Sequence, residues 1–434
     1  MSRHSSCKQT LCLQNLLTFN GVYVNKFNMP EKYTKPFRGI VYNKEKAGDI
    51  ASCVCPPYDV VSDARSYYKK NEFNAIRLEL PESLPSMDKY NAAKHTMDEW
   101  LHKGVLELDG KETVYVYEQR FDVEGNSFLR RGFIALNKLD RGRILTHEET
   151  RKKAKEDRER LITTLKTYTS LIFGLYEDKS NEIEDILISA RKDIMYDFID
   201  EQAINNRFYR MTDGREIAGL SALMDEKNIY IADGHHRLDV SYKLKIPYIP
   251  LYLTNMYSSG IVILPYHRVI KFSGSRNIKD LLNSIRGYVE IEKCSLINDN
   301  SIKKALKDIS ESENLAFVLC SKDDPENLYI LKEKTPVPMD NDLHESLRML
   351  KVNVVHAGAL KHLFKIGDEE ISFTQDPFES INSIKDGSID LAVFLPPTTV
   401  REVKSIADNS LFMPPKSTFF YPKILTGLVF YKYA

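Results

Sequence analysis

A dense group of reactive side chains lies in the motif DGHHR at residues 233–237, directly after the apolar residues 229–232. A helix that begins at this glycine would direct unpaired backbone N–H groups and a partial positive charge toward an anion. Arg237 adds a guanidinium, which can hold phosphate through two hydrogen bonds. The motif therefore predicts a phosphate-binding turn that contains His235, His236 and Arg237.

Asp233 stands at the point where it could cap this helix, bind Mg2+ or accept a proton. The structural alternative is that Asp233 is only an N-cap and that the two histidines pack or face solvent. Two imidazoles and a guanidinium in one dipole-positive turn are unfavourable without an anion, and this favours a binding site. Adjacent histidines on a helix point in different directions, so His235 and His236 are not expected to share a metal.

A second motif, THEET, occupies residues 146–150. Thr146 and Glu149 fit a capping box, which predicts a helix start here and leaves three side chains without a local role: His147, Glu148 and Thr150. Glu148 could accept a hydroxyl proton or bind Mg2+. The alternative is an exposed helix start followed by a solvated charged face at residues 151–160, from which Arg158 could turn inward.

Two further segments combine cations with hydrogen-bonding groups. Residues 264–269 (LPYHRV) place His267 and Arg268 at a strand end, a weak signal when taken alone. Residues 413–423 (MPPKSTFFYPK) place cations and hydroxyls beside a stiff Pro-Pro turn, and this group suits an oxyanion: Lys416, Ser417, Thr418 and Lys423.

Strand-like and helix-like patterns alternate around these motifs and predict a mixed α/β fold. Strands are expected at residues 37–42, 113–121, 128–139, 171–176, 228–232, 249–253, 260–264, 315–319, 328–331 and 391–395, with a β-rich end at 417–433. Helices are expected after caps at Ser62 and Ser86, the second ending at Gly104, and then at 146–168, 183–205, from 236, at 278–285 and at 302–309.

The 434 residues suggest two or three domains. Residues 1–28 contain no acids and are expected to form a disordered extension before a start at Met29. The alternative is a weak targeting signal, since basic and hydroxyl residues precede the short apolar patch at 11–17. We expect one α/β region at 29–275, which carries the first two motifs, and a second at 276–434, which carries the C-terminal motif.

Composition excludes several classes of protein. Lys+Arg and Asp+Glu both number 61, so the chain lacks the surplus positive charge of a general nucleic-acid coat. The sequence contains no run of about 18 apolar residues, so no membrane-spanning helix is predicted. The six cysteines form no CxxC pair, which favours reduced thiols in the cytoplasm. P-loop, GxGxxG, kinase HRD and DFG, GxSxG and HExxH motifs do not occur, so a phosphoryl-transfer enzyme would need another scaffold.

Six motifs occur in one order between about residues 35 and 432: PFRG at 36–39, PPYDV at 56–60, HEET with KEDR at 147–158, ADGHHR at 232–237, LPYHRV at 264–269 and MPPKSTFFYPK at 413–423. Together they resemble a family long classed as a domain of unknown function, whose members include the pyrophosphate-dependent L-serine kinases. The resemblance implies a ParB/sulfiredoxin-like core with a second C-terminal α/β region. It implies phosphoryl transfer from pyrophosphate to free L-serine, giving O-phospho-L-serine, a precursor of cysteine. This chain has Tyr266 and Leu238-Asp239 where Thr and Tyr-Glu would be expected.

The resemblance carries specific roles to residues that match its motifs. The donor would be held with Mg2+ by the phosphate-binding groups His235, His236, Arg237, Lys416, Ser417, Thr418 and Lys423. Glu148 is favoured as the base and Asp233 as the Mg2+ ligand, although the two roles could be exchanged. The remaining candidates for substrate binding are His147, Thr150, Arg158, His267, Arg268, Asp59 and Arg38, of which Asp59, Arg38 and Arg268 are named by charge alone.

Two alternatives stay open at this point. ATP or ADP could replace pyrophosphate as the donor, for serine or a similar small hydroxyl compound. A non-catalytic ParB-like protein that binds nucleotides or DNA is disfavoured by the zero net charge, so neither nucleic acid nor a membrane is expected as a partner. The sequence does not distinguish a monomer from a homodimer. All these interpretations require that the groups near residues 235 and 420 meet in one cleft.

Overall fold

The protein is described by a computed structural model, which covers residues 32–340 and 342–434. The predicted extension at residues 1–28 and the start at Met29 lie outside the described residues. Within the described part, no helix is both long and apolar enough to cross a membrane.

The larger sheet has nine strands in the order β6-β11-β8-β12-β5-β4-β10-β9, with β1 paired to β5. Its strands are β1 (Thr34–Lys35), β4 (Val114–Val123), β5 (Asn126–Lys138), β6 (Ile144–Leu145), β8 (Ile172–Tyr176), β9 (Asp193–Ile199), β10 (Asn205–Met211), β11 (Ile229–Asp233) and β12 (Tyr248–Asn255). Alternate residues of β4 and β5 enter two different apolar clusters, so the sheet buries both faces.

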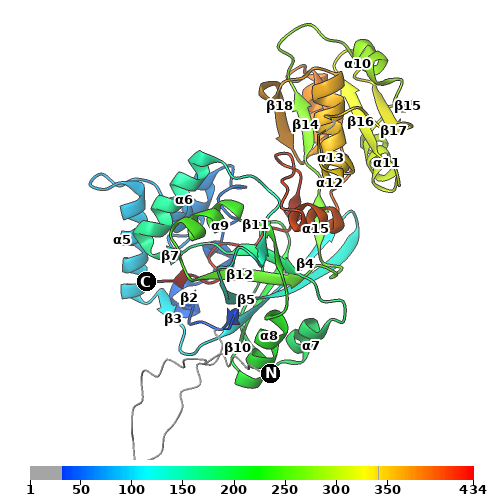
Figure 1. Ribbon diagram of the computed structural model, residues 1–434. Helices are drawn as coiled ribbons and strands as arrows, with labels where there is room; N and C mark the ends of the chain where they lie inside the picture. Colours follow the sequence, from blue (N-terminus) through cyan, green and yellow to red (C-terminus); the bar gives the residue numbers. More distant parts are fainter. Residues whose placement is uncertain (1–31, 341) are drawn as a thin grey trace, which may run out of the picture.

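A second sheet of six antiparallel strands has the order β15-β17-β16-β19-β14-β18 and lies at the upper end of the molecule in Figure 1. Its strands are β14 (His267–Ile270), β15 (Val289–Ser295), β16 (Ala316–Ser321), β17 (Asn327–Glu333), β18 (Ile371–Thr374) and β19 (Leu391–Phe394). The remaining strands pair in twos: β2 (Ile40–Tyr42) with β3 (Leu106–Leu108), β7 (Thr167–Tyr168) with β21 (Tyr431–Lys432), and β13 (Val262–Leu264) with β20 (Phe419–Tyr421).

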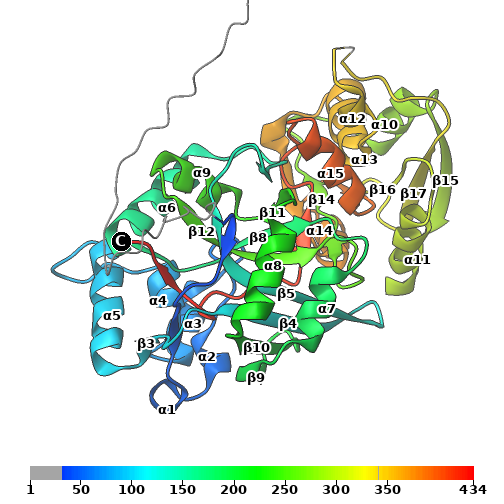
Figure 2. The same ribbon diagram turned by 60° about the horizontal axis from the view of Figure 1, so that its bottom comes forward.

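Helices cover the large sheet in groups, with α5, α6 and α9 together and α7 beside α8 (Figures 1 and 2). Those of the first part of the chain are α1 (Lys44–Ala47), α2 (Ile50–Cys53), α3 (Ala64–Lys70), α4 (Ile76–Glu79), α5 (Lys89–Lys103), α6 (Lys152–Leu165), α7 (Glu182–Ser189), α8 (Gly214–Met224) and α9 (His235–Lys243). Those that follow are α10 (Ile278–Ile285), α11 (Asp299–Ser310), α12 (Glu345–Arg348), α13 (Lys351–Asn353), the π-helix η1 (Val354–Leu363), the 3-10 helix η2 (Asp368–Glu370), α14 (Pro377–Lys385) and α15 (Val400–Asp408).

The chain enters the second sheet after β13 and returns to the first part through β20, which pairs with β13. The C-terminal motif at 413–423 therefore lies beside the large sheet rather than at the end of the second one. The domain boundary near residue 275 stays a prediction. Strand β14, which precedes it, belongs to the six-stranded sheet.

The mixed α/β class is confirmed, as are elements with strong local signals. The predicted hairpin forms from β4 and β5, with positive φ at Glu124 (50°) and Gly125 (81°). Gly104 ends α5 in the left-handed conformation. The predicted N-caps at Ser62 and Ser86 are wrong, because the carboxylates of Asp63 and Asp88 accept the first free N–H groups instead.

Two helix predictions fail where distant pairing is stronger than the local pattern. The predicted helix at 146–168 begins only at Lys152, because residues 146–150 are extended and Met413 N–H donates to the His147 carbonyl at 2.9 Å. The capping box at Thr146 therefore does not form. The helix-rich stretch predicted at 183–205 contains only α7, and the next residues form β9 because they pair with β10.

Gly234 lies between β11 and α9 with φ of 95°, and an added Cβ would lie 3.1–3.3 Å from the Arg237 guanidinium. Gly234→Ala is expected to destabilise the protein by about 1–3 kcal/mol, because a left-handed conformation strains any other residue. Urea unfolding measures this change. Gly214→Ala is the control, since a Cβ at the first residue of α8 meets nothing within 4 Å. Equal stability of both variants would contradict the role of Gly234.

Candidate functional site

Asp233, at the end of β11, is the centre of the site. One of its oxygens, Oδ1, accepts a hydrogen bond from Lys423 Nζ at 2.7 Å, and the other, Oδ2, accepts from Arg237 Nη2 at 3.1 Å. Burial by itself would raise the pKa of Asp233, but these two cations outweigh burial and lower the pKa to about 2. Asp233 is not the N-cap of α9, because Gly234 holds that position. The carboxylate is therefore a permanently charged anchor for two cations.

Arg237 is buried, and both of its terminal nitrogens donate hydrogen bonds within the protein, while its Nε has no partner among the described residues. Its Nη1 donates to the Leu171 carbonyl at 2.6 Å while Nη2 donates to Asp233. Its guanidinium also lies 6.0 Å from the ring of Tyr58. Because only 3% of Arg237 is exposed, its contribution to an anion here is positive charge rather than an open bidentate contact.

His147 and His235 pack edge to face, with ring centroids 4.7 Å apart. His147 Nε2 lies 3.2 Å from Thr418 Oγ1, and His235 Nδ1 lies 3.7 Å from Glu148 Oε2. Burial lowers the pKa of His235 to about 4 and that of His147 well below its usual value. Both rings are neutral near pH 7, so they can offer N–H groups to an anion but no charge.

His236 lies on the outer side of the same turn, where its Nε2 accepts from the Arg151 backbone N–H at 3.0 Å. Burial also lowers the pKa of His236. The DGHHR turn therefore supplies backbone N–H groups, neutral imidazoles and one internal guanidinium.

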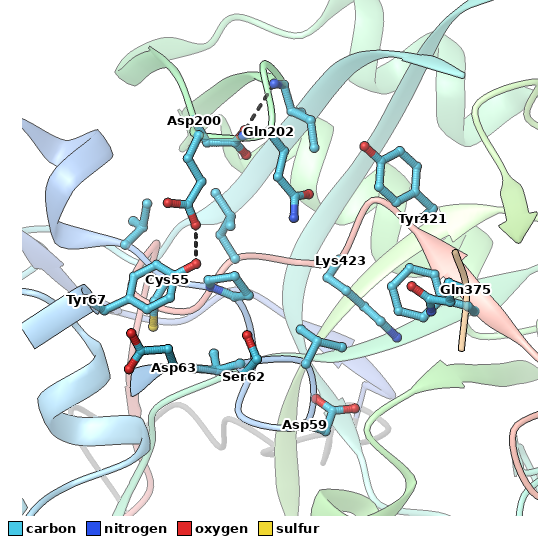
Figure 3. A pocket seen from close by; sticks show the side chains of 18 of the residues that line it. Cys55, Asp59, Ser62, Asp63, Tyr67, Asp200, Gln202, Gln375, Tyr421 and Lys423 are labelled. Atoms are coloured by element: carbon cyan, nitrogen blue, oxygen red, sulfur yellow. Dashed lines mark hydrogen bonds between the residues drawn. The ribbon is translucent and has the colours of Figure 1, made fainter. Parts of the chain in front are cut away.

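A cavity of about 660 Å³ lies next to the contact between Lys423 and Asp233, and Lys423 and Asp59 point into it (Figure 3). Neither the DGHHR turn nor Glu148 is among the described residues that line it. Segments from both sheets build its walls. Asp200 and Ile204 lie between β9 and β10 of the large sheet, whereas Gln375 follows β18 and Tyr266 precedes β14 of the second sheet. Lys416 also lines the cavity, and its Nζ lies 3.4 Å from the Tyr266 hydroxyl. Among the described residues, Lys416 makes no ion pair with a carboxylate, so its charge is available to a ligand.

Two further carboxylates surround Asp233. The side chain of Asp59 is open to the cavity, where desolvation and the negative charge of Asp233 raise its pKa. The pKa of Glu148 is raised by burial and by Asp233. Asp233 therefore repels both other carboxylates, and an additional cation beside Asp233 would relieve that repulsion.

Mg2+ fits these donors only as an ion shared with a ligand. In the described part of the chain, no three His, Cys, Asp or Glu side chains form a ready metal site. Mg2+ commonly takes one or two protein carboxylates and fills its other positions with phosphate oxygens and water. Asp233 suits this arrangement, because each of its oxygens retains a further lone pair.

The DGHHR motif, the HEET motif and the C-terminal motif meet in the structure. Lys423 contacts Asp233, Thr418 contacts His147, and Glu148 pairs with Met413 through the backbone. Ser417 faces away from the turn and donates to the Pro414 carbonyl at 2.6 Å.

Several predicted substrate-binding residues do not line the cavity and are bonded elsewhere in the protein. Thr150 donates to Asp239 at 2.5 Å, and Arg38 donates to the Asp109 carbonyl at 2.7 Å. Arg158 is buried under the Tyr58 ring, where its guanidinium binds Glu79 and Asp157. It did turn inward, but toward acids of the protein.

His267 and Arg268 are buried in β14. His267 Nδ1 accepts from the Leu395 N–H at 3.3 Å, and Arg268 Nη1 donates to the Tyr266 carbonyl at 2.5 Å. Burial lowers the pKa of Arg268 to about 9 and that of His267 to about 3. Sequence reasoning missed Gln375, since an isolated glutamine after a strand carries no signal of a site.

The buried His267 generates a prediction about pH dependence. Between about pH 3 and 6.5 the unfolded chain binds a proton that folded His267 does not, so stability falls as pH decreases through this window. His267→Asn, which keeps an acceptor for Leu395 N–H, is expected to reduce this slope by up to about 1.4 kcal/mol per pH unit. Urea unfolding between about pH 4.5 and 6.5 measures the slope, with exposed His95→Asn as the control. An unchanged slope would show that His267 titrates normally.

No curated protein matches this chain significantly. Three similar solved structures are a conserved hypothetical protein from Pyrococcus furiosus (15% identity, 67% of this chain and 92% of that chain, TM-score 0.33), a free serine kinase in complex with AMP (14%, 66% and 86%, 0.35) and SbnI with a C-terminal truncation from Staphylococcus aureus (10%, 68% and 86%, 0.35). These values are too low to assign a function. The family match is firmer, because it covers residues 34–353. As the six motifs predicted, the chain belongs to the family described as "Protein of unknown function (DUF1015)".

Proposed function

We propose that this protein is a small-molecule kinase that transfers a phosphoryl group from pyrophosphate to the hydroxyl of free L-serine, giving O-phospho-L-serine. The observation that carries the proposal is the contact between Asp233 of the DGHHR turn and Lys423 of the C-terminal motif, next to the cavity that Lys423 lines. Phosphoryl transfer depends mainly on positioning and on positive charge around the phosphate oxygens. The site combines both.

The donor would bind where Lys416 and Lys423 line the cavity, next to the contact between Lys423 and Asp233. Lys416 makes no ion pair in the described part of the chain, and Lys423 can share its three N–H donors between Asp233 and a phosphate oxygen. His235 Nε2 is buried without a hydrogen-bond partner, which suits a donor to an anion. Mg2+ held by Asp233 and the donor would neutralise charge that develops on the phosphate oxygens.

The carboxylates divide the remaining roles by their environments. Asp233 is a poor base, because its pKa is about 2 and both oxygens accept from cations. Glu148 has a raised pKa, which suits a base that takes the serine hydroxyl proton while the hydroxyl oxygen attacks phosphorus and inorganic phosphate leaves. Asp59, open to the cavity, would bind the ammonium group of serine.

Glu148→Gln is expected to lower turnover by about 100-fold or more and to leave pyrophosphate affinity nearly unchanged, because the amide keeps the shape but cannot accept the proton. Steady-state assays and calorimetry measure the two quantities. Glu149→Gln, at the exposed neighbouring position, is the matched control. Turnover near that of the unmodified protein would remove Glu148 from the chemistry.

The choice of donor is tested directly by incubating the protein with L-serine and pyrophosphate, ATP or ADP in turn, and assaying O-phosphoserine by mass spectrometry. Product with pyrophosphate, abolished by EDTA and restored by Mg2+, is the expected result. Product formed only with ATP or ADP would show that a nucleotide is the donor, and the protein would still be a serine kinase. Salt-sensitive retention of DNA without product from any donor would instead indicate a binding protein.

A further inference from the structure

Arg130, in the middle of β5, is completely buried beneath the C-terminal motif. Its guanidinium donates to the main-chain oxygens of Tyr421 and Pro422 and to the side-chain oxygen of Gln119. No carboxylate in the described part of the chain forms a salt bridge with it. A buried guanidinium without a carboxylate is stable only if oxygen atoms accept its hydrogen bonds, so the contacts of Arg130 and the position of these oxygens depend on each other.

Arg130 belongs to a row of polar residues that crosses three adjacent strands. It lies opposite Gln119 of β4, which in turn lies opposite Asn206 of β10. Gln119 Nε2 donates to the Lys423 carbonyl at 3.2 Å and lies 3.4 Å from Asn206 Oδ1. The row thus binds three consecutive main-chain oxygens, those of residues 421–423.

Arg130 and Gln119, which we call the clamp, bind the backbone at a point where it no longer pairs with another strand. Strand β20 ends at Tyr421, so residues 422 and 423 have no sheet hydrogen bonds to fix them. The Lys423 side chain nevertheless reaches Asp233 and lies over the Phe419 ring, 4.4 Å from its centroid. A lysine side chain is flexible, and its ammonium is well placed only if its main chain is fixed.

We propose that Arg130, together with Gln119, is a positioning residue that holds Lys423 at the place where the phosphoryl donor binds. The identity of that donor rests on the proposed function, whereas the placement of Lys423 does not. Arg130 touches neither the cavity nor the reacting groups, so it acts only through Lys423.

The first test measures the placement of Lys423 without any ligand. The Lys423 amine is reductively methylated in the full-length protein, and the rate is followed by peptide mass spectrometry. Arg130→Lys and Gln119→Met are expected to speed methylation by roughly fivefold or more, the factor that corresponds to losing one buried hydrogen bond. Thr34→Val is the matched control, because it removes a buried hydrogen bond to Asn137 of the same strand β5, away from residues 421–423.

The second test is a double-mutant cycle for pyrophosphate affinity, measured by calorimetry. Arg130→Lys is expected to weaken binding about tenfold in the natural chain and less than about twofold in the Lys423→Met variant. A merely structural Arg130 would weaken binding equally in both.

Each result decides the proposal. Faster Lys423 methylation and non-additive affinities support it, and unchanged methylation in folded variants overturns it. If Arg130→Lys does not fold, Gln119→Met gives the same two outcomes. If the natural chain binds no pyrophosphate, the proposed function fails while the methylation rates still test the clamp.

Discussion

The partly buried ion pair between Asp233 and Lys423 joins two segments that are 190 residues apart in the chain, and the site depends on it. A carboxylate removed from water is stable only with cations beside it, and Asp233 has two. Losing Lys423 would leave negative charge with only Arg237 to balance it. The ion pair therefore holds the C-terminal motif against the DGHHR turn, because Lys423 and Arg237 together balance the charge of Asp233.

The cations of this region separate into two kinds. The guanidiniums of Arg130, Arg158 and Arg237 are buried and donate hydrogen bonds to main-chain oxygens or to acidic side chains of the protein. The ammonium groups of Lys416 and Lys423 reach the cavity. This division is physically reasonable, because a planar guanidinium can satisfy several fixed oxygens at once, while an ammonium on a flexible stem can adapt to a ligand.

The cavity owes its shape to both sheets. The large sheet provides residues 200–204 between β9 and β10, and the second sheet contributes Tyr266 and residues 373–375 beside β14 and β18. Because the chain crosses from one to the other and returns, through β13 and β20, the two parts share one wall. The residues that could contact a ligand therefore come from several segments of the chain, and no single segment forms the cavity by itself.

Local sequence patterns determined much of this protein: the β4–β5 hairpin, the strand–glycine–helix unit around Gly234, the left-handed end of α5 at Gly104, and the types of residue that can hold an anion. Such features depend on neighbours in the chain, so composition and spacing reveal them. Tertiary structure alone decided that residues 146–150 are extended against Met413, and that Arg237 turns inward while Lys423 faces the cavity. It also decided that Arg130 and Gln119 lie beneath residues 421–423. These outcomes depend on long-range pairing and on the cost of burying charge, which are set by partners that the local sequence does not contain.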